Sequence, residues 1–186
     1  MTEKKSKLEE KITEGIYGKK EIKKSERNRF LGEYEERIIR YLTLEQVVEP
    51  GTYPEILDAI RHPEAEKLII DRDVNLSAAN DYVKLASENN LLFKRVDSPE
   101  FKGNVALVVV SDHAVDINNR KVLSRVERLK DKGISDKIIE NPGTKLCRKC
   151  WEELENKVPE ELVNYQKMSL FDKIIGVKCI CKSEIE

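Results

Sequence analysis

Apolar residues occur along the chain in short runs separated by polar segments, as in domains that alternate strands with helices. The run at residues 105–110 is aliphatic throughout and rich in β-branched side chains. It is therefore predicted to be a strand in the middle of a covered sheet. Residues 67–71 and 91–96 are predicted to form two further strands, and residues 44–48 a short fourth one.

Helix signals lie around these strands. Ser25 is a suitable N-cap for a first helix that runs to about residue 42. Apolar residues about four positions apart give this helix a stripe to bury. The stripe consists of Phe30, Tyr34, Ile38, Tyr41 and Leu42. Pro54 suits the first turn of a second helix, which ends at the sequence His62-Pro63.

Two more helices are predicted further along the chain. Ser77 caps the first of them, and Asn89-Asn90 terminates it. The second carries Val122, Val126 and Leu129 on its apolar face, with Gly133 just past its end. Since strands alternate with helices, the predicted fold is α/β, with a mixed or mainly parallel sheet flanked by helices.

The chain is predicted to have three parts. Residues 1–24 form an N-terminal arm, in which Leu8, Ile12 and Ile16 have the spacing of a short amphipathic helix. Residues 25–141 form the α/β domain. The breaker Asn141-Pro142-Gly143 separates it from residues 144–186, a small C-terminal module that contains all four cysteines of the chain.

Composition narrows the class of protein. No segment approaches the roughly 20 apolar residues of a membrane helix, and no apolar region of a secretory signal follows the N-terminus. A soluble, cytoplasmic protein without a membrane partner is therefore expected. The net charge is −1, so the chain lacks the basic field of duplex binders and no DNA partner is expected. Glutamates dilute the lysines at residues 19–24, which favours a solvated arm over a nucleic-acid patch.

Four short motifs occur in an order that resembles a known family. They are GIYG at residues 15–18, FLG at 30–32 leading to Arg37, LTLEQV at 42–47 and DHAVD at 112–116. Together they resemble the YueI family of cytoplasmic proteins from Gram-positive bacteria.

The resemblance covers roughly residues 5–130. It implies a mixed sheet flanked by helices, similar to the chorismate-mutase-like or kink-turn-binding α/β sandwiches. It implies no catalytic residue. The cysteine-bearing tail does not belong to the family pattern, so its role has to be argued from its own residues.

The cysteines form two close pairs, Cys147-x-x-Cys150 and Cys179-x-Cys181. Two such pairs can supply the four thiolates of a tetrahedral zinc shell, and the 28 intervening residues can form an insert that brings the pairs together. With four sulfur ligands and no open position, the predicted zinc site is structural. So short a tail buries little apolar surface, and metal binding would supply the missing stability.

Other interpretations of the cysteines stay open. An iron–sulfur cluster also takes four thiolates, but the familiar ferredoxin spacings are absent. A redox pair would need a thioredoxin-like strand and helix context, which the sequence before Cys147 lacks. Disulfides would be unusual in a reducing cytosol.

A second polar site is predicted on the α/β domain. Asp71 and Asp73 follow the strand at residues 67–71, whereas Asp112, His113 and Asp116 follow the strand at residues 105–110. Ligands of open α/β sheets bind beyond the carboxyl ends of strands, so these five residues could converge on a divalent cation or a polar ligand. The alternative is that they only form turns and cap helices.

The leading functional hypothesis is a non-enzymatic adaptor or regulatory protein with a protein partner and a structural zinc ion. No phosphate-binding glycine loop, nucleophile elbow or metalloprotease motif occurs in the sequence. One alternative is an RNA- or ribosome-associated protein, against which the slightly acidic balance stands. The other is a small-ligand or divalent-metal site at the strand-end aspartates.

Overall fold

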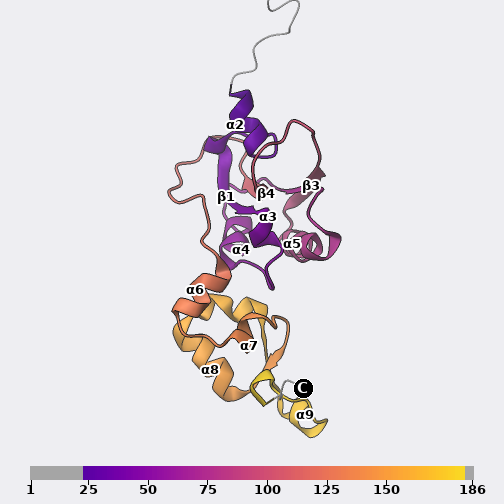
Figure 1. The fold of residues 1–186 in the computed structure, drawn as a ribbon, viewed down its shortest axis with the longest axis vertical. Coiled ribbons are helices and arrows are strands. Elements are labelled where there is room, and N and C mark those ends of the chain that lie inside the picture. Colours follow the sequence, from indigo (N-terminus) through magenta and orange to yellow (C-terminus); the bar gives the residue numbers. More distant parts are fainter. Residues whose placement is uncertain (1–22, 183–186) are drawn as a thin grey trace, which may run out of the picture.

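The computed structural model describes residues 23–182. The predicted helix around Ile12 lies outside this range. The described chain has two lobes arranged along its long axis, with the sheet in one and mainly helices in the other (Figure 1). We call residues 23–123 the α/β lobe and residues 124–182 the C-terminal lobe.

A four-stranded sheet forms the centre of the α/β lobe. Its strands are β1 (Ile38–Thr43), β2 (Lys67–Asp71), β3 (Leu92–Val96) and β4 (Val105–Val110), in the spatial order β1-β4-β2-β3. β4 runs antiparallel to both of its neighbours, and β2 and β3 are parallel. The predicted mixed α/β sheet is confirmed, although antiparallel pairs predominate.

Both faces of the sheet are covered. One face packs against α3 (Leu44–Val47), α4 (Pro54–Ile60) and α5 (Leu76–Glu88), where Tyr53 and Tyr82 are fully buried. The other face packs against Phe30 and Leu31 of the segment that follows α2 (Lys24–Arg29), and against Phe101 of the chain between β3 and β4. Because every residue of β4 is buried, its continuous aliphatic run is what a strand in this position requires.

The predicted helix from Ser25 to residue 42 is wrong. The helix ends at Arg29, and Leu31 and Gly32 follow with φ values of 55° and 91°. Gly32 N donates to the carbonyl of Arg27 at 2.7 Å, and that arginine's Nε donates back to the carbonyl of Gly32 at 2.9 Å. This closure turns the chain through the 3-10 helix η1 (Glu35–Arg37) into β1. The predicted stripe is buried at four of its five positions, but from two different elements.

Two smaller predictions are also corrected. Residues 44–48 form the short helix α3 instead of a strand, because Thr43 and Gln46 make a reciprocal capping box. Thr43 Oγ1 accepts from Gln46 N at 3.3 Å, and Gln46 Oε1 accepts from Thr43 N at 2.9 Å. Helix α5 begins one residue before Ser77, and its N-cap is Asn75, whose side chain accepts from Ala78 N at 2.8 Å.

The C-terminal lobe is built from short elements around its own core. These are α6 (Arg125–Asp131), α7 (Asp136–Ile139), β5 (Lys145–Leu146), α8 (Arg148–Lys157), η2 (Pro159–Asn164), β6 (Gln166–Lys167), α9 (Leu170–Ile174) and η3 (Ile180–Lys182). β5 and β6 pair in parallel. No helix within residues 23–182 combines the length and the apolarity that crossing a bilayer requires.

The buried clusters do not divide at the predicted breaker, residues 141–143. Val122 belongs to the core of the α/β lobe, whereas Leu129 and Ile139 pack with Leu146 and Leu154 of the tail. The last helix that the sequence assigned to residues 25–141, α6, therefore packs into the C-terminal lobe (Figure 1). Whether either lobe folds alone stays a prediction.

A buried polar junction joins the two lobes. Arg125, at the start of α6, is fully buried and donates from Nε to Glu161 Oε2 at 2.8 Å. Its other guanidinium nitrogens donate to the carbonyl of Pro50 in the α/β lobe and to the hydroxyl of Tyr165. Asn164 Oδ1 accepts from the backbone N–H of Thr52 at 2.8 Å, again across the junction.

Candidate metal centre

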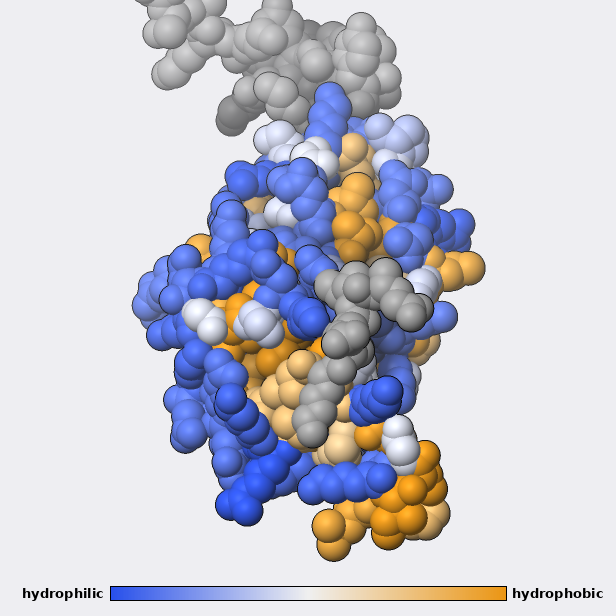
Figure 2. Space-filling model, turned by 60° about the horizontal axis from the view of Figure 1, so that its bottom comes forward, coloured by the Kyte–Doolittle hydropathy of each residue, from blue (hydrophilic) through white to orange (hydrophobic). Residues whose placement is uncertain are grey.

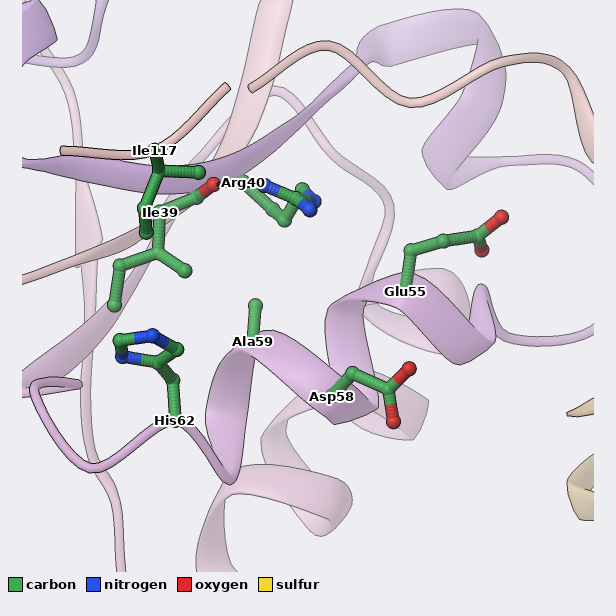
Figure 3. A pocket seen from close by; sticks show the side chains of 7 residues that line it. All are labelled: Ile39, Arg40, Glu55, Asp58, Ala59, His62 and Ile117. Atoms are coloured by element: carbon green, nitrogen blue, oxygen red, sulfur yellow. Dashed lines mark hydrogen bonds between the residues drawn. The ribbon is translucent and has the colours of Figure 1, made fainter. Parts of the chain in front are cut away.

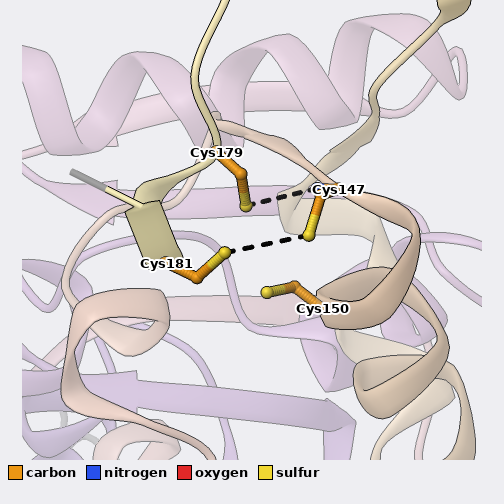
Figure 4. Close-up of side chains that lie close together, drawn as sticks. All are labelled: Cys147, Cys150, Cys179 and Cys181. Atoms are coloured by element: carbon orange, nitrogen blue, oxygen red, sulfur yellow. Dashed lines mark hydrogen bonds between the residues drawn. The ribbon is translucent and has the colours of Figure 1, made fainter.

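The four cysteine sulfurs lie together at one edge of the C-terminal lobe. The Sγ atoms of Cys147, Cys150, Cys179 and Cys181 are all within 4.8 Å of one another. Those of Cys147 and Cys181 are 3.8 Å apart, and all four side chains point toward a common centre (Figure 4). A tetrahedral zinc ion with Zn–S bonds of about 2.3 Å places its sulfurs ~3.8 Å apart. The two cysteine pairs, 28 residues apart in sequence, thus meet with the spacing of one ion.

Local structure positions the first pair. Cys147 follows β5 and is the N-cap of α8, so Cys150 lies in the first turn of that helix. The two-residue spacer returns both sulfurs to the same side of the helix start. The positive end of the helix dipole at this terminus stabilises thiolates over thiols.

The second pair comes from the chain that follows α9. Cys179 is buried, and its Sγ accepts a hydrogen bond from the backbone N–H of Cys147 at 3.2 Å. Cys181 lies in η3 and is exposed. The Cys147–Cys150 pair therefore donates a backbone N–H to a sulfur of the Cys179–Cys181 pair. Such outer contacts orient ligands around metal ions.

The environments of the thiols differ. Burial raises the pKa of Cys150, and burial followed by the hydrogen bond with Cys179 raises that of Cys181. Burial also opposes ionisation of Cys147, but hydrogen bonds from the backbone N–H of Cys150 and from the neighbouring thiols lower its pKa to about 7. Cys147 therefore ionises more readily near neutral pH than Cys150 or Cys181.

Buried apolar side chains pack around the cysteines. Cys150 and Cys179 belong to the same buried cluster as Leu154, Val158 and Tyr165. Trp151 packs against this cluster from its edge, and the ammonium of Lys167 lies 5.6 Å from the centre of its ring. The cysteine centre is therefore continuous with the core of the C-terminal lobe.

The five strand-end residues do not converge on one site. β4 is antiparallel to β2, with Lys67 opposite Val110 and Ile70 opposite Leu107. The carboxyl ends of these two strands therefore lie at opposite edges of the sheet. The predicted shared site is wrong because it assumed that the strands run in the same direction.

Each of the two groups has local partners. Asp71 Oδ1 accepts from Asp73 N at 2.9 Å, which is the turn that the alternative interpretation expected. At the other edge, His113 Nδ1 is 2.6 Å from Asp112 Oδ1, and His113 Nε2 is 3.7 Å from a carboxylate oxygen of Glu64.

Asp116 is exposed, and the helix that follows it is capped by Ser124 instead. Within the described part of the chain, the four cysteines are the only group of three or more possible metal ligands that lie together.

A cavity of about 230 Å³ lies beside α4, at a place where the sequence predicts no site. Ile39, Ala59 and Ile117 form its apolar wall, and the polar side chains around it are Arg40, Glu55, Asp58 and His62 (Figure 3). Those four lie spread around the wall and are not aimed at one point. Arg40 donates to the carbonyl of Ile39 at 2.8 Å, and Glu55 is 3.3 Å from Arg128. The cavity therefore lacks the convergent polar groups of a built binding site.

The fold and the centre define a mixed α/β domain that carries an additional lobe with four clustered cysteines. Residues 5–121 match the family of proteins of unknown function called DUF1694, and the chain belongs to this family.

It is 31% identical over 121 residues to the YueI protein of Bacillus subtilis (strain 168), a match that covers 60% of this chain and 92% of that protein. The crystal structure of YueI from B. subtilis superposes with a TM-score of 0.53 at 27% identity, covering 64% of this chain and 94% of that one. The resemblance to the YueI family is confirmed.

The end of the family match coincides with a change in packing. The match stops at residue 121, next to Val122, which belongs to the α/β core, and before Leu129, which belongs to the C-terminal core. All four cysteines therefore lie beyond the matched region. The candidate metal centre is a feature of this chain's additional lobe.

Proposed function

We propose that this protein is a non-enzymatic adaptor or regulatory protein whose C-terminal lobe is held together by one structural zinc ion. The ligands are Cys147, Cys150, Cys179 and Cys181. The observation that carries the proposal is the gathering of their four Sγ atoms within 4.8 Å of one another. This spacing suits a single ion with four thiolate ligands.

Zinc suits the centre better than the alternatives do. The 3.8 Å separation of Cys147 Sγ and Cys181 Sγ is far longer than the ~2.05 Å of a disulfide bond. An iron–sulfur cluster inserts a core of several metal and sulfide atoms between its ligands, so its cysteines stand farther apart than those of a mononuclear site. Four sulfurs around one ion also leave no open position for a substrate, which favours a structural role over a catalytic one.

The position of the ion explains what it would stabilise. It would join the start of α8 to the chain after α9, closing the segment that contains η2, β6 and α9. The C-terminal lobe is small, so the closure would add stability that apolar burial alone does not supply. The α/β lobe and the zinc-held lobe would then present separate surfaces to a protein partner.

Elemental analysis of the freshly purified chain tests the metal. We expect about one zinc per chain, as four thiolates make one tetrahedral site. Cys150→Ser should lower the zinc content, whereas Lys149→Ser should not, because Lys149 is exposed between the same two cysteines. Metal-free protein with four titratable thiols and an intact C-terminal lobe would refute the zinc site.

Chelation tests its structural role. Removing the ion should make residues 124–182 sensitive to limited proteolysis and leave the α/β lobe protected, because the two lobes have separate buried cores. Equal protection of both lobes after verified zinc removal would contradict that role. The adaptor role itself would be refuted by turnover of a small molecule by the pure protein.

A further inference from the structure

Helix α9 presents its apolar side to solvent. Leu170 and Ile174 are 78% and 81% exposed, and Phe171 and Ile175 are 67% and 60% exposed. The polar residue Asp172, in the middle of the helix, is buried. Figure 2 shows apolar side chains that project from the end of the C-terminal lobe. The outward arc is as wide as the stripe that a helix normally turns toward a core, so the amphipathicity of α9 is inverted.

Specific contacts hold α9 in this orientation. Asp172 Oδ2 accepts from Ser169 N at 2.8 Å and Ser169 Oγ accepts from Asp172 N at 3.1 Å, which makes a capping box. Asp172 Oδ1 accepts from the ammonium of Lys145 on β5. At the other end of the segment, Cys179 is anchored in the cysteine centre. Both oxygens of the buried Asp172 carboxylate accept hydrogen bonds. Helix α9 therefore cannot turn its apolar side inward without breaking these bonds.

The exposed charged residues between Val163 and Cys181 are all lysines. Between Val163 and Cys181 the charged residues are Lys167, Asp172, Lys173 and Lys178. Asp172 is paired with Lys145, and the three lysines are exposed. The counterpart of this surface should therefore be anionic. Self-association through α9 would bring the same lysines face to face and is disfavoured by their repulsion.

The chemistry of this surface distinguishes a lipid from a protein counterpart. Lysine is depleted in protein–protein interfaces, where arginine and tyrosine are preferred. Interfacial segments on membranes combine Leu and Phe on one side with Lys on the other, and lysines near the surface add attraction to anionic lipids. The segment from Leu170 to Lys178 has this second combination.

We propose that residues 170–178 dock on the surface of an anionic lipid bilayer. The side chains of Leu170, Phe171, Ile174 and Ile175 enter the headgroup region, and Lys173 and Lys178 contact lipid phosphates. The lobe lies on the membrane and does not span it. This inference goes beyond the proposed function and rests on it in one respect, since the zinc ion closes the segment that presents α9.

Vesicle sedimentation tests this inference with the full zinc-loaded chain. We expect binding to vesicles of phosphatidylcholine mixed with phosphatidylserine, weakening with added salt. Pure phosphatidylcholine vesicles should bind at least about tenfold less, because the lysine attraction is absent. Ile174→Glu should reduce binding to the mixed vesicles by about tenfold or more, since it places a carboxylate in the inserted face. Leu76→Glu is the matched control, with the same change at a 67% exposed leucine of the α/β lobe.

Several outcomes would overturn the lipid proposal. One is absence of binding to the mixed vesicles, and another is an equal effect of Ile174→Glu and Leu76→Glu. A third is a dimer, detected by analytical ultracentrifugation, that Ile174→Glu dissolves, because a second copy would then cover α9. Zinc content is measured on every sample. A chain that holds zinc and ignores the vesicles refutes the lipid proposal alone, and one that binds vesicles without zinc refutes only the metal site.

Discussion

Arg125 and Glu161 form an ion pair at 2.8 Å in which neither side chain is exposed to solvent. The pair lies where α6 and η2 of the C-terminal lobe meet the chain before α4. Burial alone would lower the pKa of Arg125, but the Glu161 carboxylate and the Tyr165 hydroxyl raise it, so the guanidinium stays charged. Two charges without access to water are stable only as a satisfied pair.

Removing one partner of this pair should be strongly destabilising. Glu161→Leu leaves the Arg125 cation buried without a counterion and should lower the free energy of unfolding by about 3–5 kcal/mol. Urea unfolding measures the loss. The double variant Arg125→Met with Glu161→Leu should recover part of it, because the fully buried cation is then removed as well, while Arg128 keeps its pairs with Glu55 and Glu160. Glu152→Leu, which breaks the exposed pair with Arg148, should change stability little. A Glu161→Leu variant as stable as Glu152→Leu would mean that the junction is open to water.

The position of the lobe boundary predicts how truncations behave. A chain that ends at residue 123 keeps both buried clusters of the α/β lobe, and residue 121 is also where the family match ends. It should melt cooperatively. A chain that ends at residue 141 leaves Leu129 and Ile139 without their partners in the tail. It should bind a hydrophobic dye and aggregate more readily, as measured by dye fluorescence and light scattering. If the chain ending at residue 141 melts cooperatively and the chain ending at residue 123 aggregates, α6 belongs to the α/β lobe.

Val108→Asp should prevent stable folding. Val108 is fully buried, pairs with Tyr41 and Ile69 in the two neighbouring strands, and has no partner for a charge. Burying an unpaired carboxylate there should reduce the free energy of unfolding by about 4 kcal/mol or more. Circular dichroism during thermal melting measures the effect. Leu92→Asp is the matched control, because Leu92 is in the same sheet but 67% exposed. A normal melt for Val108→Asp would contradict the position of β4.

His113 should titrate above its ordinary pKa of 6.5. The hydrogen bond to Asp112 is the main cause, and the nearby Glu64 carboxylate adds to it. Because the pKa is raised in the folded state, the stabilising contact is complete below 6.5 and is lost as the pH rises through the folded value. NMR titration of the imidazole measures it. Asp112→Asn should return the pKa toward 6.5. Asp71→Asn should not move it, because Asp71 lies at the other edge of the sheet. A change in the pKa of His113 on Asp71→Asn would indicate that the residues after β2 and those after β4 share one site.

The sequence alone determined the features that depend on neighbouring residues. Three of the four predicted strands form. In β2 and β4 the continuous aliphatic runs favour extended chain, because their branched side chains fit a covered, pleated sheet. The spacing of the cysteines in the sequence also predicted that their sulfurs would lie together. A spacer of one or two residues constrains two thiolates to the same side of a turn, so the gathering of four sulfurs needed only that the two pairs meet.

Tertiary structure decided what depends on distant partners. The apolar stripe from Phe30 to Leu42 fits a helix as well as a turn followed by β1, and only pairing with β4 selected the strand. The direction of β4 separated the aspartates, because strand direction is set by long-range connections and not by local sequence. Arg125 cannot be distinguished from the other charged residues of the chain until Glu161, 36 positions away, is placed beside it. A buried charge is tolerated only where its counterion is already held, and that condition exists only in the assembled fold.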